Sequence, residues 1–249
     1  MLWRNQKEMA LLNRPSRALL ARLLLAVDYP VHVDLTIDAV YGSAPPRSAR
    51  NQIQKCVSEL RAQGVEIIER AGTYSVNLPA GALDTQRFTT LVHRAHTITA
   101  PDRRALTLRR ADSVWRGPAF AGLQESVFRS AAAEWDEKRL MALTERIEAE
   151  MLCHRFHEVV PELRRLLLEN PLNESLHALF MVACVQTGRV SEAIRCYTAL
   201  RYRLADELGI DPPGMLQALH QMILQQEPEL LQIIALDQIE SLASVASRH

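Results

Sequence analysis

Residues 48–60 read SARNQIQKCVSEL, and their polar side chains are of types that donate hydrogen bonds and reach outward. An ordinary solvent-facing helix would carry Glu and Lys on its outer side, whereas amides are prominent here. An Asn or Gln amide both donates and accepts, which matches an adenine edge, and a Lys ammonium donates to guanine acceptors. The residue types therefore predict a helix that reads base edges in the major groove of DNA.

Helical spacing divides this stretch into an apolar face and a polar face. The members of the apolar stripe are Ala49, Ile53, Cys56, Val57 and Leu60. The residues that we predict to read bases, on or beside the polar face, are Asn51, Gln52, Lys55 and Ser58. Glu59 lies on the same helix, where a carboxylate near phosphate is unfavourable unless it pairs with Arg or accepts from a cytosine amine.

Arginines near the helix ends, together with two residues of the next segment, have a different predicted role. Contacts to phosphate fix the position of a protein on DNA and make its affinity depend on salt. The predicted phosphate contacts are Arg47, Arg50, Arg61, Arg70 and Thr73. The alternative interpretation is a solvated helix with no ligand. A short helix before the stretch and a hairpin after it favour DNA reading.

The elements around this stretch follow the order of a winged helix-turn-helix. The pattern predicts a helix over 15–30, a short second helix capped by Asp34, and a third helix capped by Ser48. Residues 65–70 and 73–78 then alternate with a period of two on either side of an Ala-Gly turn. This alternation predicts a β-hairpin that serves as the wing.

Beyond the hairpin the helical pattern continues along the chain. The predicted helices cover 83–99, 105–115, 124–153, 156–169, 173–187, 191–208 and 213–226. Val159 aligns with Ala193, and Leu163 with Tyr197, at an offset of 34 residues, which is the period of tetratricopeptide (TPR) repeats. We therefore predict a mainly α protein. Its expected parts are a winged helix-turn-helix DNA-binding domain (1–78), an all-α TPR-like domain (84–226) and an amphipathic tail (227–249), which packs back on that domain or joins a second protomer.

Length, charge and the lengths of the apolar runs indicate a two-domain protein that does not span a membrane. The 249 residues suffice for two domains with cores of their own, and the net charge is zero. Residues 1–78 carry ten Lys and Arg against seven Asp and Glu, and the remainder carries nineteen against twenty-two. No apolar run approaches the roughly 18 residues of a membrane span, and the secretory signal pattern is missing. These features predict a cytoplasmic protein without a membrane partner.

The motifs indicate neither an enzyme nor a bound metal or cofactor. The sequence contains no nucleophile elbow, zinc-protease helix or phosphate loop. Cys153 and His154 with His157, and His93 with His96, lack further ligands nearby in the sequence, so turn or solvent-exposed positions are the better interpretation. The four cysteines form no C-x-x-C pair and are predicted to be reduced core residues.

Several segments resemble known families. WRGPAFAGL (115–123), PLNE (171–174) and LADELGIDPP (204–213) resemble the bacterial transcriptional activator domain. PPRSARNQIQKCVSELR (45–61), together with the hairpin, resembles an OmpR-type winged helix. From about Leu11 to Leu224, the chain is therefore similar to actinobacterial antibiotic-regulatory proteins of the SARP type.

The resemblance implies a transcriptional activator that works in the nucleoid. Members of the family bind direct repeats in double-stranded DNA near promoters of secondary-metabolite gene clusters and recruit RNA polymerase holoenzyme. The implied partners are thus promoter DNA, RNA polymerase and, on DNA, a second copy of the chain as a homodimer. The alternative function is that of a helical TPR-like interaction or scaffold protein whose winged helix docks protein instead of DNA.

Two features depart from the family pattern. Members place a small β-sheet before the first helix, and few residues precede Pro15 here, so either the start lies upstream or the sheet is trimmed. The family's wing has a Gly-rich turn before its Tyr, whereas the turn before Tyr74 keeps only Gly72. One Gly can still close a turn, so we expect a wing of ordinary shape.

Overall fold

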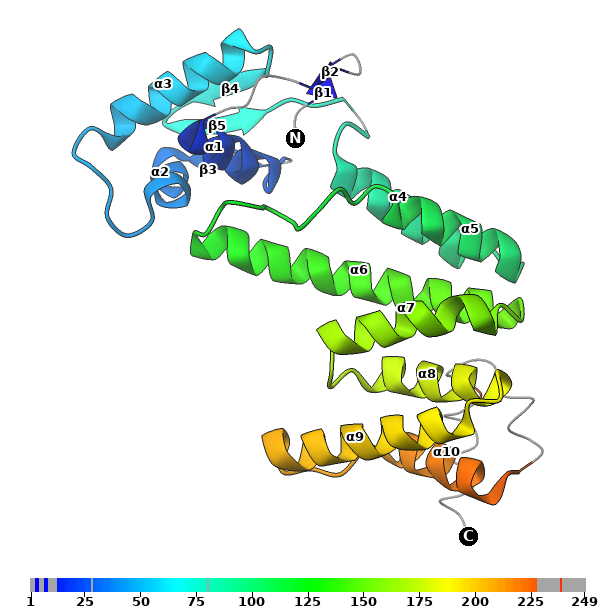
Figure 1. Cartoon of the computed structure of the whole chain (residues 1–249). Helices are drawn as coiled ribbons and strands as arrows, with labels where there is room; N and C mark the ends of the chain where they lie inside the picture. The colour runs from blue at the N-terminus through cyan, green and yellow to red at the C-terminus, as the bar shows by residue number, and fades with distance from the viewer. Residues whose placement is uncertain are drawn as a thin grey trace. The chain divides into compact units, whose positions relative to one another are not determined.

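The computed structural model describes residues 3–4, 7–8, 13–27, 29–79, 81–227 and 238 (Figure 1). The chain divides into two compact units. The first unit consists of residues 1–87 and 114–139, and the second consists of residues 88–113 and 140–249. Most of the predicted tail, 227–249, lies outside the described residues.

Three helices and a small antiparallel sheet form the winged helix of the first unit, which confirms the predicted fold. Its elements are β1 (Trp3–Arg4), β2 (Lys7–Glu8), α1 (Arg14–Leu24), β3 (Val31–His32), α2 (Val33–Tyr41), α3 (Ala49–Ala62), β4 (Ile67–Arg70) and β5 (Thr73–Val76). The sheet has the order β3-β5-β4, and Thr73 pairs with both His32 and Arg70. The strand β3 was not predicted, because two residues are too few to show an alternation. Ahead of α1, β1 and β2 pair with each other.

The helix starts differ from the predicted ones in their caps. The helix α2 is capped by His32, whose Nδ1 accepts from the backbone N–H of Asp34 at 3.3 Å. The prediction that Asp34 caps this helix was therefore wrong, and Asp34 lies in its first turn. Ser48 occupies the N-cap position of α3, but its hydroxyl accepts from Gln52 Nε2 at 2.9 Å and makes no capping bond.

The core of the first unit includes a residue from far along the chain. Phe128 is fully buried in the same cluster as the apolar residues of α1 and α3. Its ring stacks on Phe120 with a centroid distance of 5.8 Å. Arg14 in α1 forms an ion pair with Glu125. The segment 114–139 thus completes the winged helix, although the hairpin ends at Val76.

The remaining elements are helices. They are α4 (Asp84–His96), α5 (Pro101–Asp112), α6 (Ser126–Leu152), α7 (Phe156–Glu169), α8 (Glu174–Gln186), α9 (Val190–Leu208) and α10 (Gly214–Gln225). Their bounds follow the predicted ones closely except for α5, which begins four residues earlier than predicted because Pro101 suits a first helical turn. The unit boundary between residues 139 and 140 falls within α6.

The TPR-like repeat is visible in the second unit as equivalent burial and equivalent turns. Val159 and Ala193 are both fully buried, and Leu163 and Tyr197 are both in the core. After α6, the N–H of Arg155 donates to the carbonyl of Glu150 at 3.1 Å. At the equivalent turn after α8, the N–H of Arg189 donates to Cys184 at 2.7 Å. The predicted all-α TPR-like architecture is confirmed.

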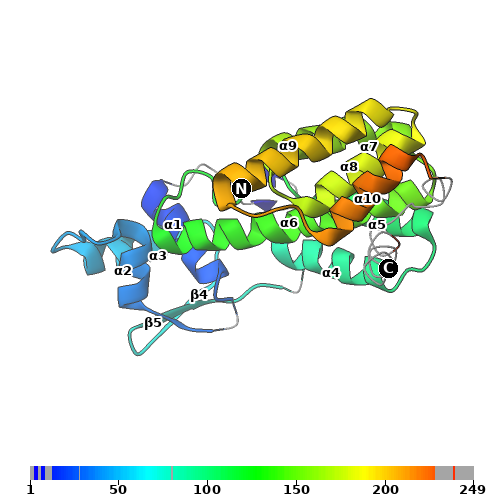
Figure 2. The same ribbon diagram turned by 90° about the horizontal axis from the view of Figure 1, so that it is seen from below.

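Helix α8 is enclosed by α7, α9 and α10 (Figure 2), and all residues from Leu176 to Cys184 are buried. His177 lies in this helix with its Nε2 3.0 Å from the carbonyl oxygen of Pro171 and its Nδ1 3.0 Å from Cys196 Sγ. Burial lowers the pKa of His177 and raises the pKa of Cys196 to about 12. A neutral imidazole that donates to Pro171 and accepts from the thiol therefore joins α8 to α9.

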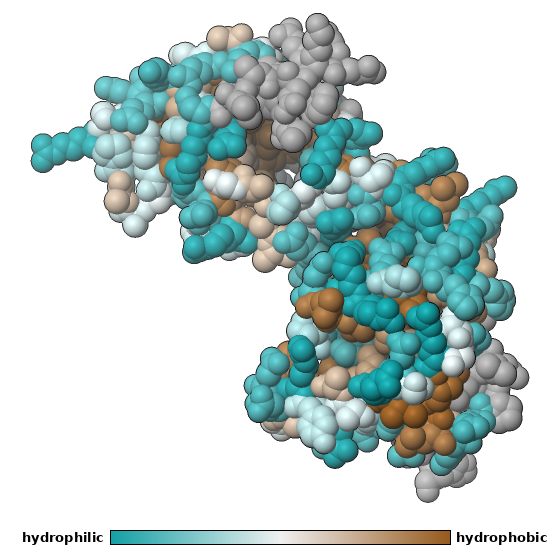
Figure 3. Space-filling model, in the orientation of Figure 1, coloured by the Kyte–Doolittle hydropathy of each residue, from teal (hydrophilic) through white to brown (hydrophobic). Residues whose placement is uncertain are grey.

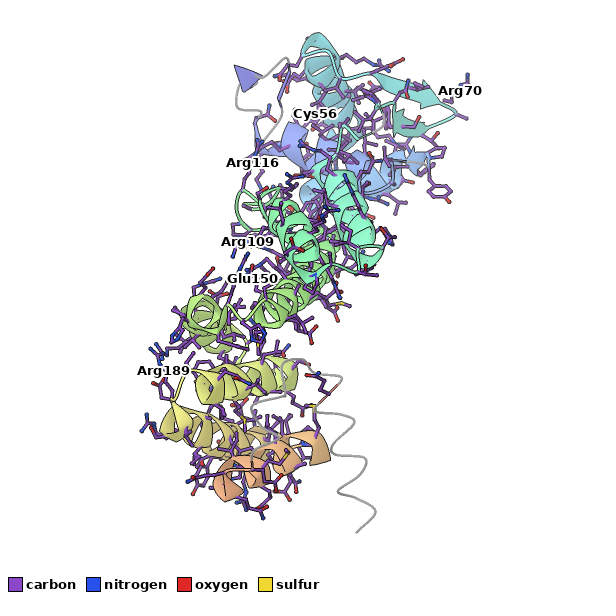
Figure 4. The ribbon with its side chains drawn as sticks, turned by 90° about the vertical axis from the view of Figure 1, so that its right-hand side faces the viewer. Cys56, Arg70, Arg109, Arg116, Glu150 and Arg189 are labelled. Carbon is purple, nitrogen blue, oxygen red and sulfur yellow. The ribbon has the colours of Figure 1, made fainter. Side chains whose placement is uncertain are left out.

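Charged residues are also buried where α5, α6 and α7 meet. Glu150 is 1% exposed and accepts from Arg146 at 2.9 Å and from Arg109 Nε at 2.7 Å (Figure 4). Arg146 reaches Glu162 at 2.7 Å as well. Because each buried charge has a partner of opposite sign, the network satisfies the condition for burying charges.

The repeat equivalence predicts opposite effects at its two turns. Gly188 (φ 74°) and His154 (φ 59°) are equivalent and both left-handed. Because a side chain disfavours this conformation by about 1–2 kcal/mol, Gly188→Ala should lower the free energy of unfolding by that amount. His154→Gly should raise it slightly. Urea unfolding of both variants measures these changes, and a neutral Gly188→Ala would contradict the assignment.

The position of Phe128 predicts that a substitution in α6 destabilises the winged helix. Phe128→Ala removes a fully buried ring and should cost about 3–5 kcal/mol. Hydrogen exchange of the β4 and β5 amides should accelerate accordingly. Phe156→Ala is the matched control, since Phe156 belongs to the core of the second unit and should leave these amides protected. Unchanged exchange in Phe128→Ala would refute the role of the segment.

Candidate DNA-binding surface

The inner face of α3 determines which of its side chains face solvent. Ile53 and Leu60 are fully buried, and Cys56 and Val57 are at most 5% exposed. The predicted apolar stripe is therefore the core face of this helix. The predicted base readers all lie on its exposed part, and they are Asn51, Gln52, Lys55 and Ser58. In Figure 3 the surface over α3 is largely hydrophilic.

Asn51 and Lys55 differ from the other two predicted base readers in their bonding. Within the described residues, the side chains of Asn51 and Lys55 make no hydrogen bond and no ion pair. Their spacing of four residues places them one turn apart on the same side of α3. An amide and an ammonium group are thus presented together to solvent, as base reading requires.

The other two predicted base readers already have internal hydrogen bonds. Gln52 Oε1 accepts from the hydroxyl of Tyr41, and its Nε2 donates to Ser48 Oγ. Ser58 Oγ donates to the carbonyl of Gln54 at 3.0 Å, one turn back in the same helix. These bonds orient both side chains along the helix surface. Either residue has to exchange or share a bond in order to contact a base.

The five predicted phosphate contacts also differ in their bonding. Arg47 and Arg70 are exposed, and no side-chain partner is found for either among the described residues. Arg70 lies at the tip of the hairpin and projects away from it (Figure 4). Arg61 donates from Nε and Nη2 to the carbonyl of Ile67, at 3.1 and 2.8 Å, and so ties α3 to β4. Thr73 Oγ1 donates to the carbonyl of Arg70.

Arg50 is the remaining predicted phosphate contact, and it carries a counter-ion. Its Nη2 lies 3.2 Å from Asp34 Oδ1, so the second residue of α3 is paired with the first turn of α2. The Arg50 side chain is 67% exposed and remains accessible to a ligand.

The wing has the predicted hairpin shape. Ala71 and Gly72 form its turn, and both have positive φ, 46° and 77°. Two consecutive residues with positive φ match the right-handed twist of the flanking strands. The carbonyl of Gly72 accepts from the N–H of Val33 at 2.9 Å, which fixes the wing to the start of α2.

Glu59 has a structural role that the sequence did not indicate. Its Oε2 accepts from Ser16 Oγ at 2.7 Å and from Asn13 Nδ2 at 2.9 Å. These hydrogen bonds, from Ser16 first and then from Asn13, hold the pKa of Glu59 below its ordinary value. The carboxylate thus joins α3 to the start of α1. The partners precede Glu59 by 43 and 46 residues, so no local pattern could reveal them.

Comparison with known proteins identifies the family. Residues 83–224 match the bacterial transcriptional activator domain. The chain belongs to the SARP-type family of transcriptional regulators. It is 36% identical over 242 residues to the regulatory protein AfsR of Streptomyces coelicolor, covering 94% of this chain and 24% of AfsR. Identity to the transcriptional regulatory protein EmbR of Mycobacterium tuberculosis is 34% over 225 residues, covering 85% of this chain and 58% of EmbR.

One further relative and one solved structure support this membership. The transcriptional regulatory protein MoaR1 of Mycobacterium tuberculosis is 30% identical over 229 residues, covering 85% of this chain and 72% of MoaR1. The solved structure of Mycobacterium tuberculosis EmbR in complex with a low-affinity phosphopeptide superimposes with a TM-score of 0.82 at 29% identity. That likeness covers 95% of this chain and 64% of the EmbR chain. This SARP-type regulator thus spans a quarter of AfsR and over half of EmbR.

The described residues of this SARP-type chain contain neither a metal cluster nor a membrane-spanning helix. Among these residues, no group of three or more His, Cys, Asp and Glu side chains is arranged to hold a metal ion, including the region of Cys153, His154 and His157. No helix in the same part is long and apolar enough to cross a membrane.

The bonds of Glu59 predict a pH-dependent contribution to stability. A carboxyl whose pKa is lowered by folding stabilises the fold above its ordinary pKa of 4.5, and this contribution is lost as pH falls through the folded value. Glu59→Gln should therefore lower the melting temperature at neutral pH, and the difference from the wild type should shrink below pH 4.5. Thermal melting across pH tests this, with Glu66→Gln as a control for an exposed carboxyl. A constant difference at all pH values would contradict it.

Proposed function

We propose that this chain is a sequence-specific DNA-binding transcriptional activator that places α3 in the major groove. The observation that carries the proposal is the exposed pair Asn51 and Lys55, which form no hydrogen bond or ion pair within the described residues, on a helix whose opposite face is buried. The hairpin that carries Arg70 at its tip belongs to the same unit as this helix. Membership of a family of transcriptional regulators supports the same conclusion.

The bonding of each residue suggests its part in recognition. Asn51 suits adenine and Lys55 suits guanine, because of their donor and acceptor groups. Gln52 and Ser58 join as base readers once their internal bonds are exchanged or shared. The phosphate contacts in this proposal are Arg47, Arg50, Arg61, Arg70 and Thr73. Arg61 and Thr73 contribute through groups left over from their internal bonds, since a guanidinium has five N–H donors and a hydroxyl also accepts.

The wider regulatory role rests on the family. Its relatives include the transcriptional regulator RedD of Streptomyces coelicolor and the regulatory protein DnrI of Streptomyces peucetius. We propose that the chain binds direct repeats at promoters of a secondary-metabolite gene cluster, as a homodimer on the DNA, and recruits RNA polymerase holoenzyme there. This activity would take place at the nucleoid in the cytoplasm.

Substitutions of Lys55 and Arg70 should separate base reading from phosphate contact. Lys55→Ala should weaken binding to the cognate promoter fragment by about 1–3 kcal/mol and leave binding to random DNA nearly unchanged. Arg70→Ala should weaken both and reduce the salt slope of log K by about 0.9. Gel shifts and DNase footprints over neighbouring promoters first identify the cognate fragment. Fluorescence anisotropy then measures the affinities of the variants for this fragment and for random DNA.

The control is Lys138→Ala, which removes the same charge from an exposed position in α6 and should alter neither affinity. Unchanged cognate binding by both Lys55→Ala and Asn51→Ala would refute the proposed reading face. Absence of any shift by the wild type at low salt would refute DNA binding altogether and would favour a scaffold whose winged helix docks protein.

A further inference from the structure

The carboxylate of Asp34 stands beside the proposed phosphate-binding edge of α3. Asp34 lies in the first turn of α2, and its Oδ1 is 3.2 Å from Arg50 Nη2. Its backbone N–H donates to Nδ1 of His32 at 3.3 Å, and His32 caps α2 and pairs with Thr73 of the wing strand β5. Asp34 therefore links three elements of the winged helix: β3, α2 and α3.

The pairing distinguishes Arg50 from the other exposed arginines of this surface. Within the described residues, Arg47 and Arg70 have no carboxylate partner, whereas the charge of Arg50 is compensated by Asp34. Both members of this pair are more than 60% exposed, so the ion pair is weak and open to exchange. A phosphate that reaches Arg50 would also come within a few ångströms of Asp34 and be repelled by it.

The carboxylate of Asp34 contributes little to the stability of helix α2. His32 already caps the helix, so Asp34 is not its N-cap. An acidic residue in the first turn does favour the helix dipole, but such an exposed effect is small and screened by salt. The structural role of Asp34 is thus minor, and its position against Arg50 calls for a separate explanation.

We propose that Asp34 competes with DNA phosphate for Arg50 and thereby lowers the phosphate-driven affinity of the winged helix. This inference rests on the proposed DNA binding, and it assigns to Asp34 the role of limiting the affinity for DNA. Because phosphate contacts supply essentially all of non-specific affinity, the competition acts on random DNA as well as on the cognate site. The regulator then spends less time on the non-cognate DNA that surrounds its promoters.

Asp38 provides a matched control within the same helix. It lies one turn after Asp34, is exposed, and together with Asp34 and Arg50 lines a shallow depression between α2 and α3. In the described structure its carboxylate forms no ion pair, so Asp38→Asn removes the same charge without releasing an arginine. Comparison of the two substitutions separates release of Arg50 from a general change in charge.

The experiment measures affinity by fluorescence anisotropy for the cognate fragment and for random DNA, between about 50 and 200 mM salt. Asp34→Asn should bind both DNAs about 3- to 5-fold more tightly at the lower salt, the size of one exposed ion pair. Its salt slope should steepen by about 0.9, corresponding to one more phosphate contact. Asp38→Asn should show less than half of either change.

A double-mutant cycle tests whether the effect passes through Arg50. In an Arg50→Ala background, Asp34→Asn and Asp38→Asn should bind equally. The inference alone is overturned if Asp34→Asn matches Asp38→Asn in the otherwise wild-type chain, if it weakens binding, or if its gain persists without Arg50. Failure of the wild type to bind any DNA at low salt overturns both the inference and the proposed function.

Discussion

Burial of one side of α3 is the constraint on which the proposed DNA-binding surface depends. Ile53, Val57 and Leu60 are nearly inaccessible to solvent, and a rotation of the helix would bring polar groups into their place at a large cost. Asn51 and Lys55 consequently face outward, and within the described residues no hydrogen bond or ion pair holds either side chain. Glu59 and Arg61 add directional bonds, to α1 and β4 respectively, that fix the position of the helix along its axis. The orientation of the proposed base-reading side chains thus depends on how the inner face of α3 packs in the core.

The same core extends beyond the elements that usually define a winged helix. Phe128 comes from α6, yet its ring is as thoroughly buried as Leu19 of α1. The ion pair between Arg14 and Glu125 lies at the edge of this added contact. Because α6 continues past the unit boundary into the TPR-like block, one uninterrupted helix supplies core residues to both units. Destabilisation of this helix therefore affects more than one core.

Much of the fold could be predicted from periodicity, because apolar spacing in α3 and the 34-residue offset between Leu163 and Tyr197 are local or regular patterns. The polar residue types of the α3 face were visible for the same reason. Sequence could not reveal how those side chains bond. Gln52 and Arg61 find internal partners that depend on tertiary geometry, and Phe128 reaches its core only after the chain has folded back. Interactions between distant residues leave no periodic trace.

A winged helix that is closed by a later segment has an evolutionary consequence. Recombination that joined only residues 1–78 to a new partner would leave unfilled the space that Phe128 occupies. An exchange that keeps this core intact must therefore carry residues 114–139 together with the winged helix. Point substitution on the outer face of α3 is less restricted, because Asn51 and Lys55 are exposed and can change without disturbing the core.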